Sequence, residues 1–413
     1  MTEGCDTVNI EGLRRNLRLL LAFKLASFFF VYLPVSLAYY QEIGLNLAQI
    51  NALQSLSWGM LILTEIPTGA LADRFGHRQA LIVGALLHVL AFCVLTVTYS
   101  FVWVVVAHVL LGLGISFVRG ADSALAREST DRLGEKTEKQ PYFKFERRGV
   151  FFAGLGEGAA ALAALALVLG LDENGPRAAM GVQVISSIVL LILAVLTTEA
   201  RQLPKASLGG FKVSLAEHWR TTRTNLVAAY RNKHVRWLAV YGAVIGCTTQ
   251  TMVWLTLPYF QSLGLTPLWY AALWAGYHFV YAGLSFTVDA YENVFGRSGA
   301  LTSLVGWGAV AYIALMVLPG YWGLLMLLAF FFIRAVQLPI VRDYLTKEVK
   351  GDYATALSVL STVQLTLFVI MNSVLGIVME QYSVYAAFGV SLVVYGLLGL
   401  LSATRLRYHA LRS

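Results

Sequence analysis

Long apolar runs constrain this chain more than any other feature of its sequence. Runs of roughly 20 residues recur from end to end, and each is long enough to cross a hydrocarbon core about 30 Å thick. Hydrophobic residues make up 58% of the 413 positions and charged residues only 13%, a composition unlike that of a soluble domain. The sequence therefore predicts an all-α membrane protein with twelve transmembrane spans, at residues 18–40, 48–71, 79–98, 102–126, 149–170, 177–198, 237–259, 268–290, 299–318, 322–345, 354–379 and 384–404.

The basic residues predict how these spans are oriented. Nearly all of the 31 Lys and Arg lie in alternate connections, counted from the N-terminus, and the opposite connections hold only Arg177. Because basic loops stay in the cytoplasm, both termini are predicted to be cytoplasmic. The net charge of +8 reflects this asymmetry, so it is no argument for binding nucleic acid.

The chain divides into two similar halves. A basic connection at 199–236 separates a six-helix bundle at 1–198 from another at 237–413, and its middle, 211–230, is predicted to be an amphipathic surface helix. Two matches between the halves indicate a duplication, with separations of 215 and 220 positions. They pair Arg119, Arg127 and Glu128 with Arg334, Arg342 and Asp343, and Phe75-Gly76 with Phe295-Gly296.

A charged turn at 69–81 reverses the chain between two apolar runs. Gly69 and Gly76 remove side chains where helices approach closely or where the backbone needs a positive φ. Asp73 lies near the C-terminal end of a helix, where the helix dipole disfavours an anion, so it needs cationic partners. Arg74, Arg78 and Arg119 are the candidates.

This turn resembles a family motif. The pattern G-x-L-A-D-R-x-G-x-R at 69–78 is similar to the motif between spans two and three of the major facilitator superfamily, with His77 replacing the usual cation. The residues Ala-Thr-Ala-Leu-Ser at 354–358 extend the similarity, although Tyr353 stands where relatives often have arginine. The resemblance implies two pseudo-symmetric six-helix bundles and transport by alternating access.

The resemblance also implies a role for the turn. It implies a gate that latches the halves together in the outward-facing state, formed by Gly69, Asp73, Arg74, Gly76, Arg78, Arg119, Asp122 and Arg334. The alternative is a static surface ion pair worth about 1 kcal/mol or less. Both interpretations stay open at the level of sequence.

Polar residues inside the spans are the candidates for proton coupling or for binding a substrate charge. They are costly in lipid and normally face a bundle interior. Glu157, among glycines at 154, 156 and 158, is the strongest candidate, and the alternative is a structural ion pair with Arg119 or Lys24. His108, Glu65 and His278 are further candidates, with structural roles as alternatives. His108 is predicted to share one face of its span with Arg119 and Asp122.

Aromatic and amide side chains at helical spacing predict the wall of a substrate cavity. An apolar wall with a few polar anchors suits an amphipathic organic solute, and aromatic faces near Glu157 would tolerate a cation. Packing between helices is the alternative for such a stripe. The candidates are Tyr32, Trp58, Gln250, Trp254, Trp274, Tyr277, Tyr281, Gln364 and Asn372.

The sequence predicts no enzyme, cofactor or metal site. It has no phosphate-binding GxxxxGK[ST] loop, and Cys5, Cys93 and Cys247 lack metal-ligand spacing. We expect a monomeric, multi-pass plasma-membrane transporter (inner membrane if bacterial) for a small-molecule substrate, coupled to protons and exporting its solute, as in the drug:proton antiporters it resembles. The alternatives are uptake or release of a metabolite by symport or facilitated diffusion, and a membrane sensor that transports nothing.

Overall fold

The computed structural model describes residues 10–133, 141–200, 233–284, 286–318, 320–348 and 353–410, with isolated positions at 216, 219, 220, 223, 224 and 227. Every regular element in these ranges is helical. The amphipathic helix predicted at 211–230 lies almost wholly outside the described residues.

Two sets of helices correspond to the two predicted halves. The first comprises α1 (Ile10–Ser27), the 3₁₀ turn η1 (Leu33–Val35), α2 (Ser36–Glu42), α3 (Leu47–Phe75), α4 (His77–Val97), α5 (Phe101–Val118), α6 (Ala121–Arg132), α7 (Pro141–Leu171), η2 (Asp172–Asn174) and α8 (Gly175–Leu196). The second comprises α10 (Lys233–Ser262), α11 (Pro267–Leu284), α12 (Val288–Val317), α13 (Trp322–Glu348), α14 (Tyr353–Gln381) and α15 (Val384–Ala410).

Three predicted spans are not continuous helices. The span at 18–40 breaks between α1 and α2, around η1, where Pro34 has no backbone N–H for a helical hydrogen bond. The span at 102–126 breaks at Gly120, whose φ is 87°. The span at 268–290 breaks between Leu284 and Val288. The prediction that His108, Arg119 and Asp122 share one helix face is therefore wrong, because Asp122 lies on α6, beyond the break.

Eight stretches of the described helices are long and apolar enough to cross a membrane, by length and composition alone. They are His77–Val97, Phe101–Arg132, Arg148–Leu196, Arg236–Ser262, Gly299–Val317, Trp322–Val341, Leu360–Gln381 and Val384–Ser402. One of these, Arg148–Leu196, includes most of α7 and all of α8. The predicted spans at 18–40, 48–71 and 268–290 fall outside them, so the number of twelve crossings stays a prediction.

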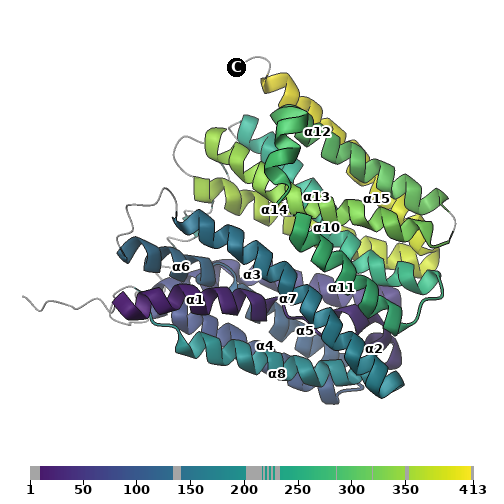
Figure 1. Ribbon diagram of the computed structural model, residues 1–413, viewed down its shortest axis with the longest axis horizontal. Coiled ribbons are helices and arrows are strands. Elements are labelled where there is room, and N and C mark those ends of the chain that lie inside the picture. Colours follow the sequence, from purple (N-terminus) through teal and green to yellow (C-terminus); the bar gives the residue numbers. More distant parts are fainter. Residues whose placement is uncertain are drawn as a thin grey trace, which may run out of the picture.

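The helices of the two halves pack mainly within their own half. Figure 1 shows α1–α8 in purple to teal in the lower part of the molecule and α10–α15 in green to yellow in the upper part. The most extensive contacts between the halves are those of α7 with α11 and of α3 with α14. These two helix pairs therefore control how the halves can move relative to each other.

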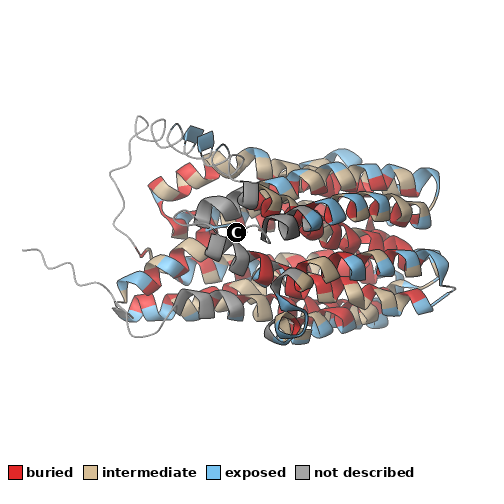
Figure 2. Cartoon of the chain, turned by 90° about the horizontal axis from the view of Figure 1, so that it is seen from above, coloured by how far each residue is buried: buried red, intermediate tan, exposed pale blue. Residues whose placement is uncertain are grey.

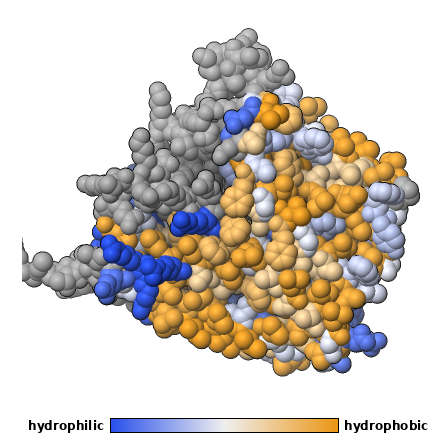
Figure 3. Space-filling model, in the orientation of Figure 1, coloured by the Kyte–Doolittle hydropathy of each residue, from blue (hydrophilic) through white to orange (hydrophobic). Residues whose placement is uncertain are grey.

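Burial and hydropathy agree with a protein that lies in a membrane. Buried residues lie on the faces of the helices that point into the bundle (Figure 2). The face in Figure 3 is mostly hydrophobic, and the strongest blue lies near the edges of the view. Large apolar side chains are exposed on many helices, such as Leu63, Val102, Ile185 and Trp307. A soluble protein rarely exposes apolar surface on this scale.

The same turn ends the first span of each half. Gly44 N donates to Gln41 O (2.9 Å), and Gly264 N donates to Gln261 O (2.9 Å). Both glycines have positive φ, 88° and 73°, which favours glycine. These pairs are 220 positions apart. Gly76 and Gly296, at the same separation, also have positive φ (104° and 65°), as expected if one helical unit had been duplicated.

Candidate functional site

Three charged or titratable side chains from both halves meet in the interior. Glu157 of α7 accepts a 2.7 Å contact at Oε2 from His278 Nε2 of α11. Its other oxygen, Oε1, lies 4.0 Å from Nη2 of Arg334 on α13. We call these three residues the charge cluster. Since α7 belongs to the first half and the other two helices to the second, the charge cluster joins the halves.

The surroundings of the charge cluster are buried and aromatic. Glu157 and His278 are almost fully buried, whereas the side chain of Arg334 is 23% exposed. His278 Nδ1 lies 2.9 Å from the carbonyl oxygen of Trp274, so its other nitrogen is directed at the carboxylate. The imidazole stacks on Trp274 and meets Phe331 edge to face, with centroid distances of 5.2 and 5.1 Å. An ion pair in such surroundings is poorly screened.

Glycines on α7 allow α11 to approach closely enough for this contact. A Cβ at Gly158 would lie 2.8 Å from Cε1 of Phe279, and one at Gly154 would lie 3.0 Å from Cδ1 of Tyr281. Real Cβ atoms are essentially never closer than about 3.0 Å to such neighbours. Gly154 and Gly158, on either side of Glu157, therefore have a packing role.

The structural partners predicted for Glu157 are wrong. Lys24 of α1 instead forms an ion pair with Asp122 of α6. Arg119, at the end of α5, has Glu65 and Asp122 as its charged neighbours. Of the basic residues that the sequence singles out, Arg334 lies beside Glu157, although the sequence assigns it to the gate. The signal that could have found it is its position within an apolar span.

The turn at 69–81 is fixed within the first half. Arg78 donates from Nε to Thr197 O (2.8 Å) and from Nη2 to Val195 O (2.9 Å), at the end of α8. Nε2 of His77 lies 3.2 Å from Oε1 of Glu128 on α6.

Gly76 has the positive φ expected of it and joins α3 directly to α4. Asp73 and Arg74 both have interaction partners, Arg74 is buried, and Gly69 lies inside α3. A latch between the halves stays a prediction.

His108 is held by two neutral groups. Its Nε2 lies 2.9 Å from the hydroxyl of Tyr40, and its Nδ1 lies 2.9 Å from Oγ of Ser57. The ring is buried and joins α5 to α2 and α3. This geometry favours the structural alternative, a neutral histidine that ties three helices together.

The predicted cavity residues are packed in this conformation. Tyr277 stacks on Phe331 (5.1 Å) and donates to Leu324 O (2.9 Å), and Trp274 is fully buried. Tyr281 lies beside the charge cluster, with its ring centroid 5.7 Å from Cζ of Arg334. Tyr32 packs against Phe92 (5.0 Å), and Gln364 lies against Gly246. Their role as a cavity wall stays a prediction.

Two of the predicted cavity residues instead join α3 to α14. Asn372 donates from Nδ2 to the carbonyl oxygen of Asn51 (2.9 Å) and to Oγ of Ser55 (3.3 Å). Trp58 meets Phe368 edge to face at 5.9 Å. Leu47 N also donates to the carboxylate of Glu380 (2.9 Å), at the same end of α3. The halves are therefore in contact at the end of the molecule that the sequence predicts to be extracellular.

Some buried polar atoms have no hydrogen-bond partner among the described residues. Gln54 Nε2 and Trp254 Nε1 are buried donors of this kind on α3 and α10. Gln250 precedes Trp254 by one turn of α10. Buried polar groups are normally satisfied, so these donors suit acceptors from outside the described part of the chain.

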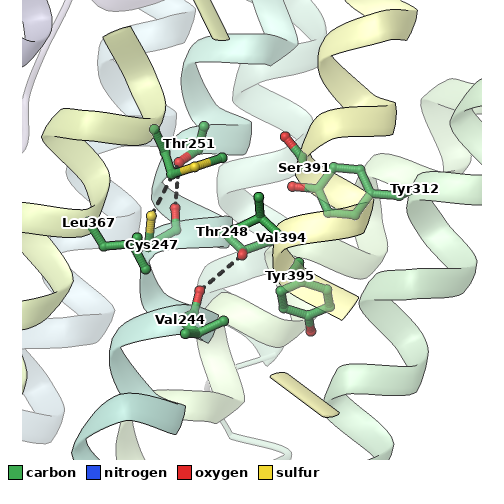
Figure 4. Close-up of a pocket in the computed structure, with 10 residues that line it drawn as sticks. Val244, Cys247, Thr248, Thr251, Tyr312, Leu367, Ser391, Val394 and Tyr395 are labelled. Atoms are coloured by element: carbon green, nitrogen blue, oxygen red, sulfur yellow. Dashed lines mark hydrogen bonds between the residues drawn. The ribbon is translucent and has the colours of Figure 1, made fainter. Parts of the chain in front are cut away.

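A small cavity in the second half, shown in Figure 4, was not predicted from the sequence. Helices α10, α12, α14 and α15 enclose it, and it has about the volume that one water molecule needs. The Tyr312 hydroxyl and Ser391 Oγ lie in its wall without a hydrogen-bond partner in the described part of the chain. Cys247, Thr248 and Thr251 line the opposite side. A buried water suits this cavity.

No metal site is evident where the structure describes the chain, because no three His, Cys, Asp or Glu side chains cluster there.

A sequence model of the Major Facilitator Superfamily matches residues 19–341. The chain belongs to the Major Facilitator Superfamily. It is accordingly a multi-pass membrane transporter and not an enzyme.

Solved structures of several transporters share the fold. The peptide transporter POT in complex with sulfate has a TM-score of 0.72 at 15% identity, over 95% of this chain and 93% of that one. The nucleoside transporter NupG has a TM-score of 0.71 at 12% identity, over 96% and 99%. The D-xylose-proton symporter has a TM-score of 0.68 at 16% identity, over 96% of both chains. A comparison with curated proteins finds no match.

Proposed function

We propose that this protein moves a small amphipathic organic solute across the plasma membrane by alternating access, coupled to protons, as a monomer. The observation that carries the proposal is the 2.7 Å contact between Glu157 and His278. A carboxylate and an imidazole at this distance hold a proton between two groups that both titrate in proteins. Because the contact joins the halves, a change in its protonation changes the energy of holding them together.

Glu157 has few charged neighbours. The titratable and charged groups that face Glu157 are His278 and Tyr281 from α11 and Arg334 from α13. On α1, the neighbouring helix, Lys24 is paired with Asp122. A proton that enters the charge cluster therefore changes a small and nearly balanced set of charges.

The conformation supports alternating access. Three sets of hydrogen bonds join the halves at the predicted extracellular end, and we call them the outer contact. They link Gln41 with Gln261, Leu47 with Glu380, and Asn372 with Asn51 and Ser55. We propose that this state is closed to the outside, and that the outer contact breaks when the transporter faces outward.

Coupling can run in either of two directions. Efflux by antiport, which the resemblance to drug:proton antiporters favours, requires solute and proton to compete for the charge cluster. Symport requires them to bind together. The long contact of Arg334 with Glu157 favours symport as the second candidate, because protonating Glu157 leaves a cation without its partner. We propose that transport is coupled to protons, whether by antiport or by symport.

The test is transport in proteoliposomes with an imposed pH gradient, by the wild type, Glu157→Gln and Glu42→Gln. Glu42 pairs with Arg177 at the surface, so it is a matched acid-to-amide control. We expect Glu157→Gln to keep solute counterflow but lose the dependence on the pH gradient, and Glu42→Gln to retain both. An unaltered gradient dependence in Glu157→Gln would remove Glu157 from the coupling. If no solute crosses under any gradient, the sensor alternative is favoured.

A further inference from the structure

Arg334 of the charge cluster lines a small cavity. It lies with Thr249, Met252 and Val253 of α10 and with Phe330 and Phe331 of α13 around a cavity of about the volume of one water molecule. Its side chain is 23% exposed, against 8% for Glu157 and 2% for His278. Of the three side chains, that of Arg334 is the most exposed, so it is the best placed to meet a solute.

The pairing of Arg334 is incomplete. Its Nη2 lies 4.0 Å from Oε1 of Glu157, beyond hydrogen-bonding distance, whereas Oε2 is taken by His278 at 2.7 Å. A guanidinium has five N–H donors in a planar fork that fits a carboxylate or a phosphate in a bidentate manner. Glu157 therefore offsets the charge of Arg334 at a distance but accepts no hydrogen bond from its guanidinium N–H groups.

The charge balance depends on protons. Without a proton between His278 and Glu157, the charge cluster has a net charge of zero. The contacts of His278 call for that proton, because Nδ1 faces a carbonyl oxygen and Nε2 faces a carboxylate oxygen, and both oxygens accept. With the proton in place the Glu157–His278 pair is neutral and Arg334 gives the cluster a net charge of +1, and an uncompensated charge buried in a membrane protein is unfavourable. A monovalent anion bound by Arg334 restores neutrality.

We propose that Arg334 is the binding site for the anionic group of the solute, a carboxylate or a comparable oxyanion attached to an apolar body that Phe330 and Phe331 contact. This inference rests on the proposed function in its symport form and names its substrate class. Proton and anion bind together, because the proton on the Glu157–His278 pair releases Arg334 for the anion. They therefore cross the membrane in the same direction, as a neutral pair.

The test is equilibrium binding to the purified full-length protein, with probes that differ only in charge. A suitable set is 3-phenylpropionate, its neutral amide 3-phenylpropionamide and the cation 3-phenylpropylamine, extended to acid, amide and amine sets with other apolar bodies. We expect the acids to bind in preference to their amides and amines. We also expect their affinity to rise as the pH falls toward 6.

Variants separate a binding role for Arg334 from a structural one. Arg334→Gln should weaken binding of the acids by about 30-fold or more, since a charged hydrogen-bonded partner is lost. Arg334→Lys should retain part of the affinity, because it keeps the charge but not the fork. Glu157→Gln should tighten binding at pH 7.5 by about tenfold and abolish its pH dependence, because Arg334 is then always released. Arg132→Gln, which removes an exposed arginine in the last turn of α6, is the matched control and should change nothing.

The outcomes distinguish this inference from the proposed function. Preferential binding of amides or amines, or no binding of any acid, overturns the anion site. An acid affinity that Arg334→Gln leaves unchanged does the same. Neither result affects proton coupling, which the pH-gradient experiment with Glu157→Gln tests by itself. Conversely, acids that bind through Arg334 in a protein without gradient-driven transport support the site and contradict the coupling.

Discussion

Gln41 and Gln261 exchange two amide hydrogen bonds, of 3.1 and 3.0 Å, and lie 220 positions apart. Phe75 and Phe295, which the sequence matches between the halves, have the same separation. The two glutamines are thus equivalent residues of the two halves that meet each other across the interface. No charge is involved, so this part of the outer contact does not depend on pH or on salt.

The first prediction concerns this pair. Gln41→Ala should favour the outward-facing state by about 1 kcal/mol, the net worth of an ordinary hydrogen bond, which is about a fivefold change in population. The measurement is the rate at which a membrane-impermeant thiol reagent labels a cysteine introduced at buried Ser55, in a background without the native cysteines. Gln261→Ala should act alike, and the double variant should add little. Gln381→Ala, at an exposed site on α14, is the control. Equal labelling in all four variants would contradict an outer contact that opens.

The second prediction concerns the stability of the charge cluster. His278→Ala leaves the buried carboxylate of Glu157 with only the 4.0 Å contact to Arg334, so we expect a loss of about 3 kcal/mol in the free energy of unfolding. Adding Glu157→Gln removes the stranded charge and should recover much of that loss. Thermal melting in detergent measures both.

The control for this prediction is another buried histidine. His88 on α4 lies 2.8 Å from the backbone oxygen of Gly84 and has no described acidic partner. His88→Ala creates a similar cavity, and Glu157→Gln should not restore its stability. Recovery in both backgrounds would show that the effect does not come from the ion pair.

The third prediction concerns the approach of α7 to α11. Gly158→Ala places a Cβ 2.8 Å from Phe279, so we expect a destabilisation of about 1–3 kcal/mol and a weaker coupling of transport to the pH gradient. Gly170→Ala, in the same helix with no atom within 4 Å of the new Cβ, should be neutral or stabilising by up to about 1 kcal/mol. Melting temperatures and gradient-driven uptake measure the two effects. Equal behaviour of the two variants would contradict the close packing of these helices.

The fourth prediction concerns the turn at 69–81. Asp73→Asn should lower the transport rate by about tenfold, as expected for a charge that stabilises one of two states, while the protein still folds and inserts. Asp131→Asn, at an exposed position near the end of α6, is the control. Transport at the wild-type rate in Asp73→Asn would contradict the latch hypothesis and favour the alternative of a static surface ion pair.

The sequence predicted the helical architecture because apolar length and basic loops are local properties. The helices match most predicted spans, and the motif at 69–78 indicated the superfamily by its local residue pattern. The failures lie at Pro34, at Gly120 and after Leu284, where the chain breaks inside an apolar run. Hydropathy averages over such breaks, so it cannot detect them.

The candidate site, too, could be predicted only in part from the sequence. Glu157 and His278 were both candidates, because charged and titratable residues in apolar spans stand out by composition. Their contact did not follow from the sequence, since 121 positions separate them and the partners suggested for Glu157 were Arg119 and Lys24. The pair Gln41–Gln261 could have been found from the match of Tyr-Gln-x-Ile-Gly-Leu at 40–45 with Phe-Gln-x-Leu-Gly-Leu at 260–265.

By itself, the sequence determined that the chain is a helical membrane protein of this superfamily, because membrane insertion and the motif depend on residues close together in the chain. Only the tertiary structure decided which charges meet. Helix packing brings Glu157 to His278 and Arg334, and it brings Lys24 to Asp122. Such pairings depend on how helices rotate and approach one another, and the glycines of α7 set that approach. Local periodicity contains no information about it.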